Sequence, residues 1–423
     1  MEKQRITCVL GAGATLGLHL PNNVKFPSTG NITDEVRKPY QDYLTNKNID
    51  IVEDMYQRMK TSLPAGWNQT EPNVHFEMLF HVLEMYAAYG MVWKYECKNS
   101  DIYPIFAPFI SPTKSYDVRE ISQIMKRFLR RIIEIVKGYD DYFAKDSGQE
   151  DWYRNFFKYF PLALDVFNFN YDTTIEQSLG EGNYEDGFEL IRGEDYSQFL
   201  PQKLFDNVRG VSTINHLHGC IRYYYERISN RAIYSYDHND LFKYQDSDTV
   251  LNMMIGHSQS QGTNQTNEEI YAGPIITGLR KTDKLNCIPY DYYHANLIKS
   301  LMKNSRLIIA GYSFGDLYMN QQLERMGLVH GENKRIVLID YWDKASVEEI
   351  GLGNFLEYKL SPKIGNFLMM MCEVNWIAKM PSHLRYNGLD KPIYSDNGCV
   401  MILACGMRDA VENYSQEIYD FLK

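Results

Sequence analysis

The sequence has no paired cysteines. Its seven cysteines are an odd number at scattered positions, and no two of them form a C-x-x-C pair: Cys8, Cys97, Cys220, Cys287, Cys372, Cys399 and Cys405. A zinc ribbon needs such pairs, and a disulfide framework is typical of short secreted chains with an even cysteine count. The sequence therefore favours buried, reduced thiols and predicts no bound metal.

Long apolar runs and an excess of basic residues are also missing. No run approaches the roughly 18 apolar residues of a transmembrane helix, and Met1–Arg5 leads into a strand-like run with no signal-peptide pattern. Asp and Glu number 54 against 44 Lys and Arg, for a net charge of −10, whereas a nucleic-acid-binding surface is basic. We expect a cytoplasmic protein that binds neither membranes nor nucleic acid directly.

The composition is that of a globular protein, with 44% hydrophobic and 23% charged residues in 423. A chain of this length can bury a large core and form one decorated domain or two domains. Short apolar runs that end in turn residues recur along it, with helical stretches between them: Ile6–Leu10, Leu164–Phe167, Thr213–Gly219, Leu307–Gly311 and Arg335–Asp340. This alternation predicts an α/β fold, a Rossmann-like, doubly wound, mostly parallel sheet.

The strand-like runs are interrupted by a long helical segment. We expect a discontinuous core of residues 1–40 and 160–345, a helical insertion at 41–159 and an α/β extension at 346–423 that closes the domain. Apolar residues at helical spacing predict helices at Val74–Tyr89 and Val118–Val136. The polar stretch Asp237–Glu269 predicts a long loop, and Pro274–Gly278 a short buried strand. Near the end, 364–371 could be strand or helix, 400–404 reads as a strand and 409–422 as a helix.

A glycine-rich turn follows the first strand-like run. Gly11, Gly13 and Gly17 are spaced G-x-G-x-x-x-G, which departs from the common dinucleotide fingerprint. Glycines let a backbone approach a phosphate closely, and a helix start beyond them offers free N–H groups. A plain tight turn explains the same residues, so both interpretations stay open here.

Polar residues stand at the ends of the next two strands. Asn170 and Asp172 follow the strand at 164–167, where they could hold a ligand or form an Asx turn. His218 occupies the corresponding place after the following strand and is a candidate general base. His216 lies on the same face of that strand, but a two-histidine metal site lacks an apparent third ligand.

A second glycine motif follows the run at 307–311. The sequence Gly311-Tyr312-Ser313-Phe314-Gly315-Asp316 places Ser313 at a G-x-S-x-G position, as in the nucleophile elbow of esterases. An esterase also needs an Asp and then a His downstream, and His330 and His383 are available by spacing alone. The alternative is a second backbone cradle for phosphate or ribose.

Taken in order, the four motifs (11–15, 170–172, 217–219 and 311–316) resemble the sirtuin-like (silent information regulator) family. The likeness is closest to the bacterial branch found in anti-phage defence systems, which Phe26–Thr29, His75–Glu77 and Pro274–Gly278 also resemble. It spans residues 6 to about 340. Four motifs in family order are fairly specific, although each alone is not.

The resemblance implies a Rossmann-type fold that binds NAD+ as substrate and has no metal. Gly11, Ala12, Gly13 and Thr15 would hold the pyrophosphate and nearby ribose. Asn170 would order a water and the nicotinamide ribose, Asp172 would contact the nicotinamide side, and His218 would act as a base through a ribose hydroxyl. The adenosine half would be lined by Gly311 and Ser313, with Asp340 near its ribose.

Two departures from the family separate this chain from sirtuin deacylases. It lacks their zinc module of two C-x-x-C pairs, and Phe26–Thr29 replaces their acidic-aromatic-arginine run. The resemblance then implies NAD+ hydrolysis in anti-phage defence by NAD+ depletion. A non-catalytic NAD or ADP-ribose sensing module and an ADP-ribosyl transferase or deacylase are the alternatives. It also implies a homo-oligomer and a partner such as a HerA-type ATPase or another phage-sensing protein.

Overall fold

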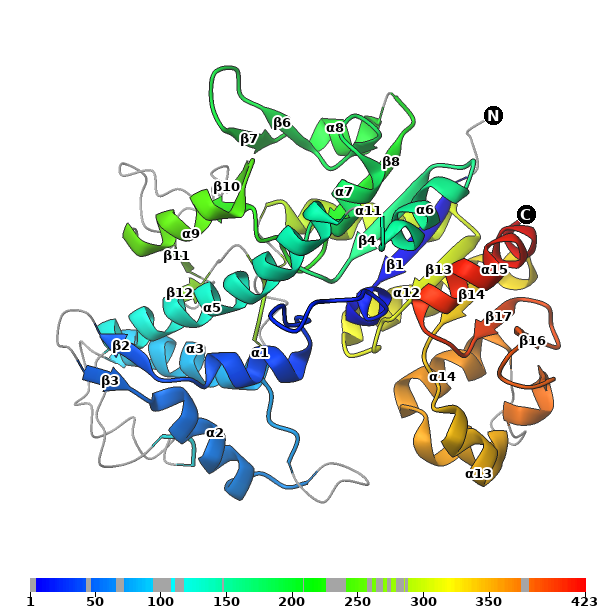
Figure 1. The fold of residues 1–423 in the computed structure, drawn as a ribbon, viewed down its shortest axis with the longest axis horizontal. Coiled ribbons are helices and arrows are strands. Elements are labelled where there is room, and N and C mark those ends of the chain that lie inside the picture. Colours follow the sequence, from blue (N-terminus) through cyan, green and yellow to red (C-terminus); the bar gives the residue numbers. More distant parts are fainter. Residues whose placement is uncertain are drawn as a thin grey trace.

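The computed structural model describes residues 5–42, 47–65, 72–93, 108–110, 118–146, 148–207, 209–225, 241–256, 261–263, 269–271, 275–278, 285, 288–373 and 380–423. Its centre is a nine-stranded sheet in the order β15-β16-β17-β14-β13-β1-β4-β8-β5 (Figure 1). The strands are β1 (Ile6–Leu10), β4 (Leu164–Asn168), β5 (Tyr184–Glu185), β8 (Ser212–His216), β13 (Arg306–Ala310), β14 (Arg335–Ile339), β15 (Leu384–Arg385), β16 (Ile393–Ser395) and β17 (Val400–Leu403).

The sheet is parallel from β5 to β17, and β16 then pairs antiparallel with both β17 and β15. All residues of β1 and β4 are buried, because helices cover both faces. This explains why these strands read as continuous apolar runs. The predicted doubly wound α/β fold is therefore confirmed.

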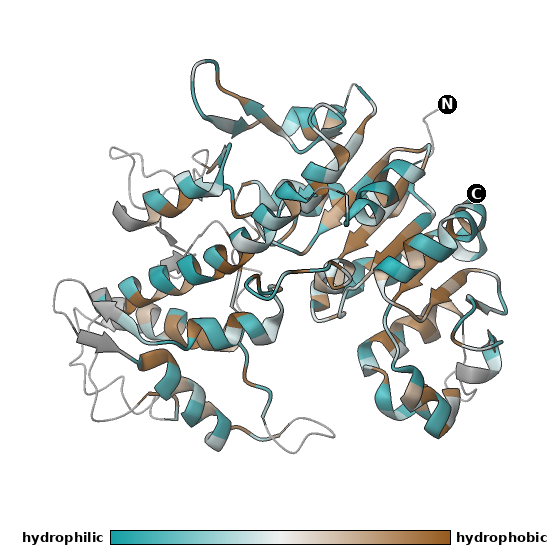
Figure 2. Cartoon of the chain, viewed as in Figure 1, coloured by the Kyte–Doolittle hydropathy of each residue, from teal (hydrophilic) through white to brown (hydrophobic). Residues whose placement is uncertain are grey.

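Alternate residues of β1 belong to two different hydrophobic layers. Ile6, Cys8 and Leu10 pack with α6 (Asp151–Tyr159), α7 (Thr174–Leu179) and α15 (Met407–Leu422). Val9 joins the other layer, with α11 (Tyr290–Lys303), α12 (Leu317–His330) and α14 (Pro362–Met371). In Figure 2 the strands are largely brown, whereas the helices over them show teal outward faces.

The predicted insertion 41–159 contains the helices α2 (Ile51–Ser62), α3 (Phe76–Trp93) and α5 (Val118–Lys145). The helix α3 packs against α2, α5 and α1 (Thr29–Val36), which precedes the insertion. A hairpin of β2 (Tyr40–Asp42) and β3 (Lys47–Ile49) links α1 to α2. The apolar stripe of α5 is buried internally, with Phe128 against Phe80 of α3 at 5.3 Å between ring centroids. The stripe is thus used within the chain. No described helix is both long and apolar enough to span a membrane.

The polar middle of the chain has more structure than its composition predicts. A second sheet has the order β6-β7-β10-β9, from β6 (Phe188–Leu190), β7 (Tyr196–Phe199), β9 (Tyr223–Tyr225) and β10 (Leu241–Tyr244). The predicted loop 237–269 is wrong where described, because it contains β10, α9 (Ser247–Gly256), β11 (Gln261–Thr263) and the start of β12 (Glu269–Tyr271). Buried Val250, Leu251 and Met254 anchor α9. Within the predicted loop 237–269, most of residues 259–265, the part expected to be least structured, lies outside the described residues.

The remaining expectations concern short segments. Residues 364–371 are helical, in α14, and the strand near 400 and the closing helix are present as β17 and α15. The strand expected at 274–278 is wrong in the described residues 275–278, where Ile275 forms only an isolated bridge with Gly219. The other elements are α8 (Pro201–Asp206), α13 (Lys344–Asn354), the π-helix η3 (Phe355–Lys359) and the 3-10 turns η1 (Ala12–Thr15), η2 (Gly331–Asn333) and η4 (Met380–His383).

Candidate active site

A cavity of about 720 Å³ opens at the carboxyl ends of β1, β4 and β13. Small-molecule sites commonly have this size, and in doubly wound sheets they lie at this edge. Nine of the ten residues expected to form a site line it: Gly11, Ala12, Gly13, Thr15, Asn170, Asp172, His218, Gly311 and Ser313. Segments distant in the sequence therefore converge on one cavity.

Close contact between the two glycine turns forms the floor of the site. Gly13 N donates to Gly311 O at 3.0 Å, and Gly311 has a φ of +59°. A Cβ on Gly311 would lie 2.1 Å from Ala14 N, and one on Gly13 would lie 2.7 Å from the Gly311 Cα. Glycine is thus required here because the two turns touch, in addition to any ligand that they receive.

Asn170 is positioned by the first glycine turn. Its Nδ2 donates to Gly11 O at 3.2 Å, and its backbone N donates to Asn168 Oδ1 at 3.0 Å. Among the described residues nothing donates a hydrogen bond to Asn170 Oδ1. The amide is therefore held in place through its nitrogen and keeps an acceptor for a ligand.

His218 is 7% exposed, and its ring packs edge-on against Phe169 at 4.8 Å. Its Nε2 lies 3.4 Å from Asp316 Oδ2, while Asp316 Oδ1 accepts from Met319 N at 3.1 Å and caps α12. The backbone O of His218 accepts from Ile276 N at 2.6 Å. A fixed carboxylate thus faces the imidazole, and the sequence had shown Asp316 only as the last residue of a motif.

Asp172 lines the cavity and also closes a local turn. It is 2% exposed, and its Oδ1 accepts from Thr174 N at 3.2 Å and from Thr174 Oγ1 at 2.5 Å. The bond to the N–H two residues later is an Asx turn, one of the two interpretations of this motif. Burial raises the pKa of Asp172.

A second buried carboxylate, which the sequence did not reveal, lies behind Asp172. Asp140 projects from α5 and accepts from Thr173 N at 2.7 Å and from Thr173 Oγ1 at 2.8 Å. Burial, followed by repulsion from Asp172, raises the pKa of Asp140 to about 7. In the sequence, the one indication of this buried carboxylate is that Asp140 continues the apolar face of the α5 helix. The helical insertion thus supports the loop that carries Asp172.

Two expected roles find less support in the geometry. Asp340 does not line the cavity; its Oδ2 accepts from Trp342 Nε1 at 3.0 Å, and burial raises its pKa to about 6. The esterase alternative needs His330 or His383 beside Ser313. Neither lines the cavity, and His330 Nε2 donates to Leu301 O at 2.8 Å.

His216 does not line the cavity and belongs instead to a buried cluster. Glu176, His216 and Cys220 place one ligand atom each within 4.8 Å of one another, so the third potential ligand missing from the sequence pattern exists. His216 Nε2 is 2.8 Å from Glu176 Oε1, however, and Lys243 Nζ lies 3.5 Å from the same oxygen. Burial would raise the pKa of Glu176, but His216 and Lys243 lower it. Lys243 supplies the positive charge that a metal would bring.

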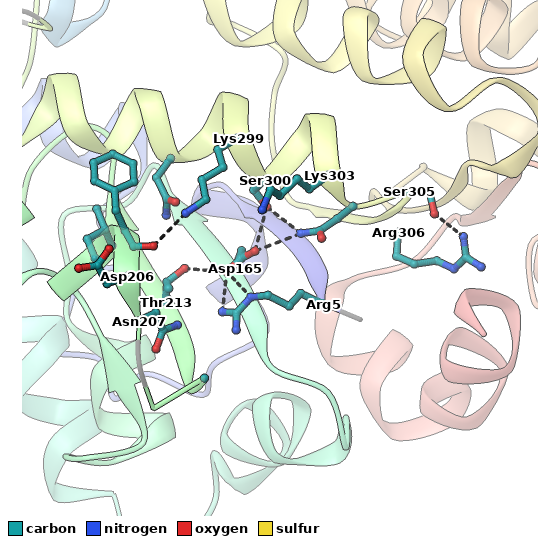
Figure 3. A pocket seen from close by; sticks show the side chains of 15 residues that line it. Arg5, Asp165, Asp206, Asn207, Thr213, Lys299, Ser300, Lys303, Ser305 and Arg306 are labelled. Carbon is teal, nitrogen blue, oxygen red and sulfur yellow. Dashed lines mark hydrogen bonds and ion pairs between the residues drawn. The ribbon is translucent and has the colours of Figure 1, made fainter. Parts of the chain in front are cut away.

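A different cavity, of about 440 Å³, lies at the opposite edge of the sheet (Figure 3). Its centre is Asp165, whose oxygens accept from Arg5 at 2.6 Å and from Thr213, Ser300 and Asn304 at 3.0 Å each. These polar groups are bonded to one another, and none belongs to a motif. The cavity at the carboxyl edge is therefore the candidate active site.

Part of the chain is similar to a known protein family. The profile of the SIR2-like domain family matches residues 165–359, and no curated protein matches the chain. The matched segment contains Asn170, Asp172, His218 and Ser313, and begins after the first glycine turn. The resemblance to the sirtuin-like family is confirmed, whereas the likeness to its anti-phage branch stays a prediction.

Proposed function

We propose that the cavity binds NAD+ and hydrolyses it to nicotinamide and ADP-ribose, because residues 165–359 match the profile of the SIR2-like domain family, whose members depend on NAD+. The observation that carries the proposal is the convergence of Asn170, His218 and both glycine turns on one cavity. The size of that cavity is also appropriate for a dinucleotide.

The reaction breaks the bond between nicotinamide and C1′ of the ribose. Positive charge develops on the ribose in the transition state, and a single water adds at C1′. Glu77 and Asp316 line the cavity, and carboxylates near a developing cation stabilise it. Asn170 Oδ1 can hold the water in position, which lowers the entropic part of the barrier.

His218 is the proposed base. Acting through a ribose hydroxyl, it would take up the proton that the attacking water releases, and the Asp316 carboxylate, 3.4 Å from Nε2, would orient the ring and stabilise its protonated form. The burial of His218 and its packing on Phe169 limit its motion.

The absence of C-x-x-C pairs supports hydrolysis over deacylation, because the zinc module of the deacylases has no counterpart in the sequence. Incubation with NAD+ followed by chromatography separates the alternatives. Equal release of nicotinamide and ADP-ribose supports hydrolysis, bound but uncleaved NAD+ supports a sensing module, and ADP-ribose attached to protein supports a transferase.

The residue assignment is tested with Asn170→Ala and His218→Ala. Each should lose NAD+ cleavage while circular dichroism stays that of the parent. His330→Ala is the matched control, because this histidine bonds Leu301 O outside the cavity. Near-parental cleavage by either site variant would reject the assignment.

We further propose, from the resemblance alone, a cytoplasmic effector of anti-phage defence that assembles as a homo-oligomer, with a HerA-type ATPase or another phage-sensing protein as partner. An unrestrained NAD+ hydrolase would deplete its own host, so a latent state is needed. Light scattering and NAD+ turnover, with and without a co-expressed neighbouring gene product, test this. A monomer with full activity alone would contradict it.

A further inference from the structure

Lys363 is the one lysine or arginine among the residues that line the cavity, where Glu77, Asp172 and Asp316 are the acidic ones. The side chain of Lys363 is exposed. It makes no hydrogen bond or ion pair with the described part of the chain, in contrast to Lys334 and Lys344, which pair with Glu373 and Asp390. An unpaired cation thus faces a cavity that otherwise carries negative charge.

Lys363 comes from a segment outside the motifs. It stands in the first turn of α14, four residues beyond the end of the SIR2-like match at 359. Ser361, which precedes α14, also lines the cavity, and its side chain makes no capping hydrogen bond. The C-terminal extension therefore adds a hydroxyl and an ammonium group to the site.

The position of α14 is fixed by the second glycine motif. Phe367 of α14 packs on Phe314 at 4.9 Å, and Phe314 packs on Tyr312 at 4.9 Å. On the neighbouring helix α12, Gly327 is close enough to Met371 that a Cβ there would lie 2.7 Å from its Cε. Lys363 consequently enters the cavity from the side of the Gly311–Asp316 loop.

We propose that Lys363, assisted by Ser361, binds the pyrophosphate of NAD+; this inference rests on the proposed function. A pyrophosphate carries two negative charges, and the glycine turns offer backbone N–H groups and the hydroxyls of Thr15 and Ser313 to it, but no cationic group. In a cavity with three carboxyl groups, the anion needs a cationic partner. A lysine on a flexible stem supplies a point charge to phosphate oxygens. The residue that neutralises the substrate thus lies in the C-terminal extension.

Binding is measured by calorimetry in a His218→Ala background, so that NAD+ is not consumed. Lys363→Ala should weaken NAD+ binding about tenfold, the loss expected for a hydrogen bond to a charged group. Lys363→Arg should retain most of the affinity. Raising the salt concentration should weaken binding less in Lys363→Ala than in the parent, because one ionic contact is gone. Lys359→Ala is the matched control, since Lys359 is exposed nearby and does not line the cavity.

Unchanged NAD+ affinity in Lys363→Ala would overturn the inference, as would an equal loss in Lys359→Ala, which would indicate a general charge effect. A loss seen with NADP+ and not with NAD+ would place the lysine at a 2′-phosphate and also overturn it.

The outcome for the proposed function is separate. If the His218→Ala protein with Lys363 intact does not bind NAD+, the NAD+ site itself is wrong. If NAD+ binds but the enzyme with His218 does not cleave it, hydrolysis is wrong while the role of Lys363 stands.

Discussion

Asp140 predicts how the stability of this protein depends on pH. Its pKa is raised from 3.8 to about 7, first by burial and then by repulsion from Asp172. A carboxyl group with a raised folded-state pKa binds a proton more tightly in the folded chain than in the unfolded chain. Its contribution to stability is therefore complete below pH 3.8 and is lost as the pH rises through 7.

The size of the effect follows from this shift. One pKa unit corresponds to about 1.4 kcal/mol, so the full loss is about 4 kcal/mol, of which about 3 kcal/mol falls between pH 5 and pH 8. With an unfolding entropy of about 2.1 cal/mol/K per residue, this corresponds to about 3 °C in Tm for a chain of 423 residues.

Asp140→Asn removes the titrating group and keeps one acceptor oxygen, to which Thr173 N and Oγ1 can both donate as they do to Asp140 Oδ1. We expect the Tm of this variant, relative to the parent, to rise by about 3 °C between pH 5 and pH 8. Differential scanning calorimetry at both pH values measures this. Asp141→Asn is the control. Asp141 follows on the same helix, its side chain is 43% exposed and it pairs with Lys137. The Tm difference between this variant and the parent should therefore be the same at pH 5 and pH 8. An equal Tm difference for Asp140→Asn at pH 5 and pH 8 would refute the reasoning.

Three other predictions concern the site. Gly311→Ala should abolish NAD+ binding and lower Tm, because its Cβ would lie 2.1 Å from Ala14 N. Gly331→Ala also strains the backbone, at a φ of +50°, but its Cβ would meet no atom within 4 Å, so it should cost only the backbone strain of about 1–3 kcal/mol and leave NAD+ binding intact; equal effects on NAD+ binding would contradict this. Asp316→Asn should keep the cap on α12, since asparagine also caps helices. The kcat for NAD+ cleavage should fall at least about tenfold, and the pH profile of kcat should move to lower pH. An unchanged pH profile would remove Asp316 from the mechanism. Elemental analysis should find no stoichiometric zinc, and an acetylated peptide should stay intact with NAD+; one zinc per chain would point to Glu176, His216 and Cys220.

The sequence contained enough information to predict the sheet and the place of the site. Apolar runs such as 6–10 and 335–339 have no polar alternation, so both faces must be buried, which favours a parallel sheet under two helical layers. The residues that follow parallel strands must meet at one edge of the sheet. This is why the sequence alone predicts Asn170, His218 and Ser313 in one cavity.

The side chains that complete the site were decided by packing between distant segments. Asp140 reaches Thr173 because α5 of the insertion lies against the loop after β4, and no local pattern encodes that contact. Lys363 faces the cavity because α14 docks on Phe314. Asp340 had the right strand-end position, but its neighbour Trp342 draws the carboxylate into a hydrogen bond away from the cavity. Strand periodicity is set locally by the chain, whereas the direction and charge of a buried side chain depend on groups brought to it from elsewhere in the fold.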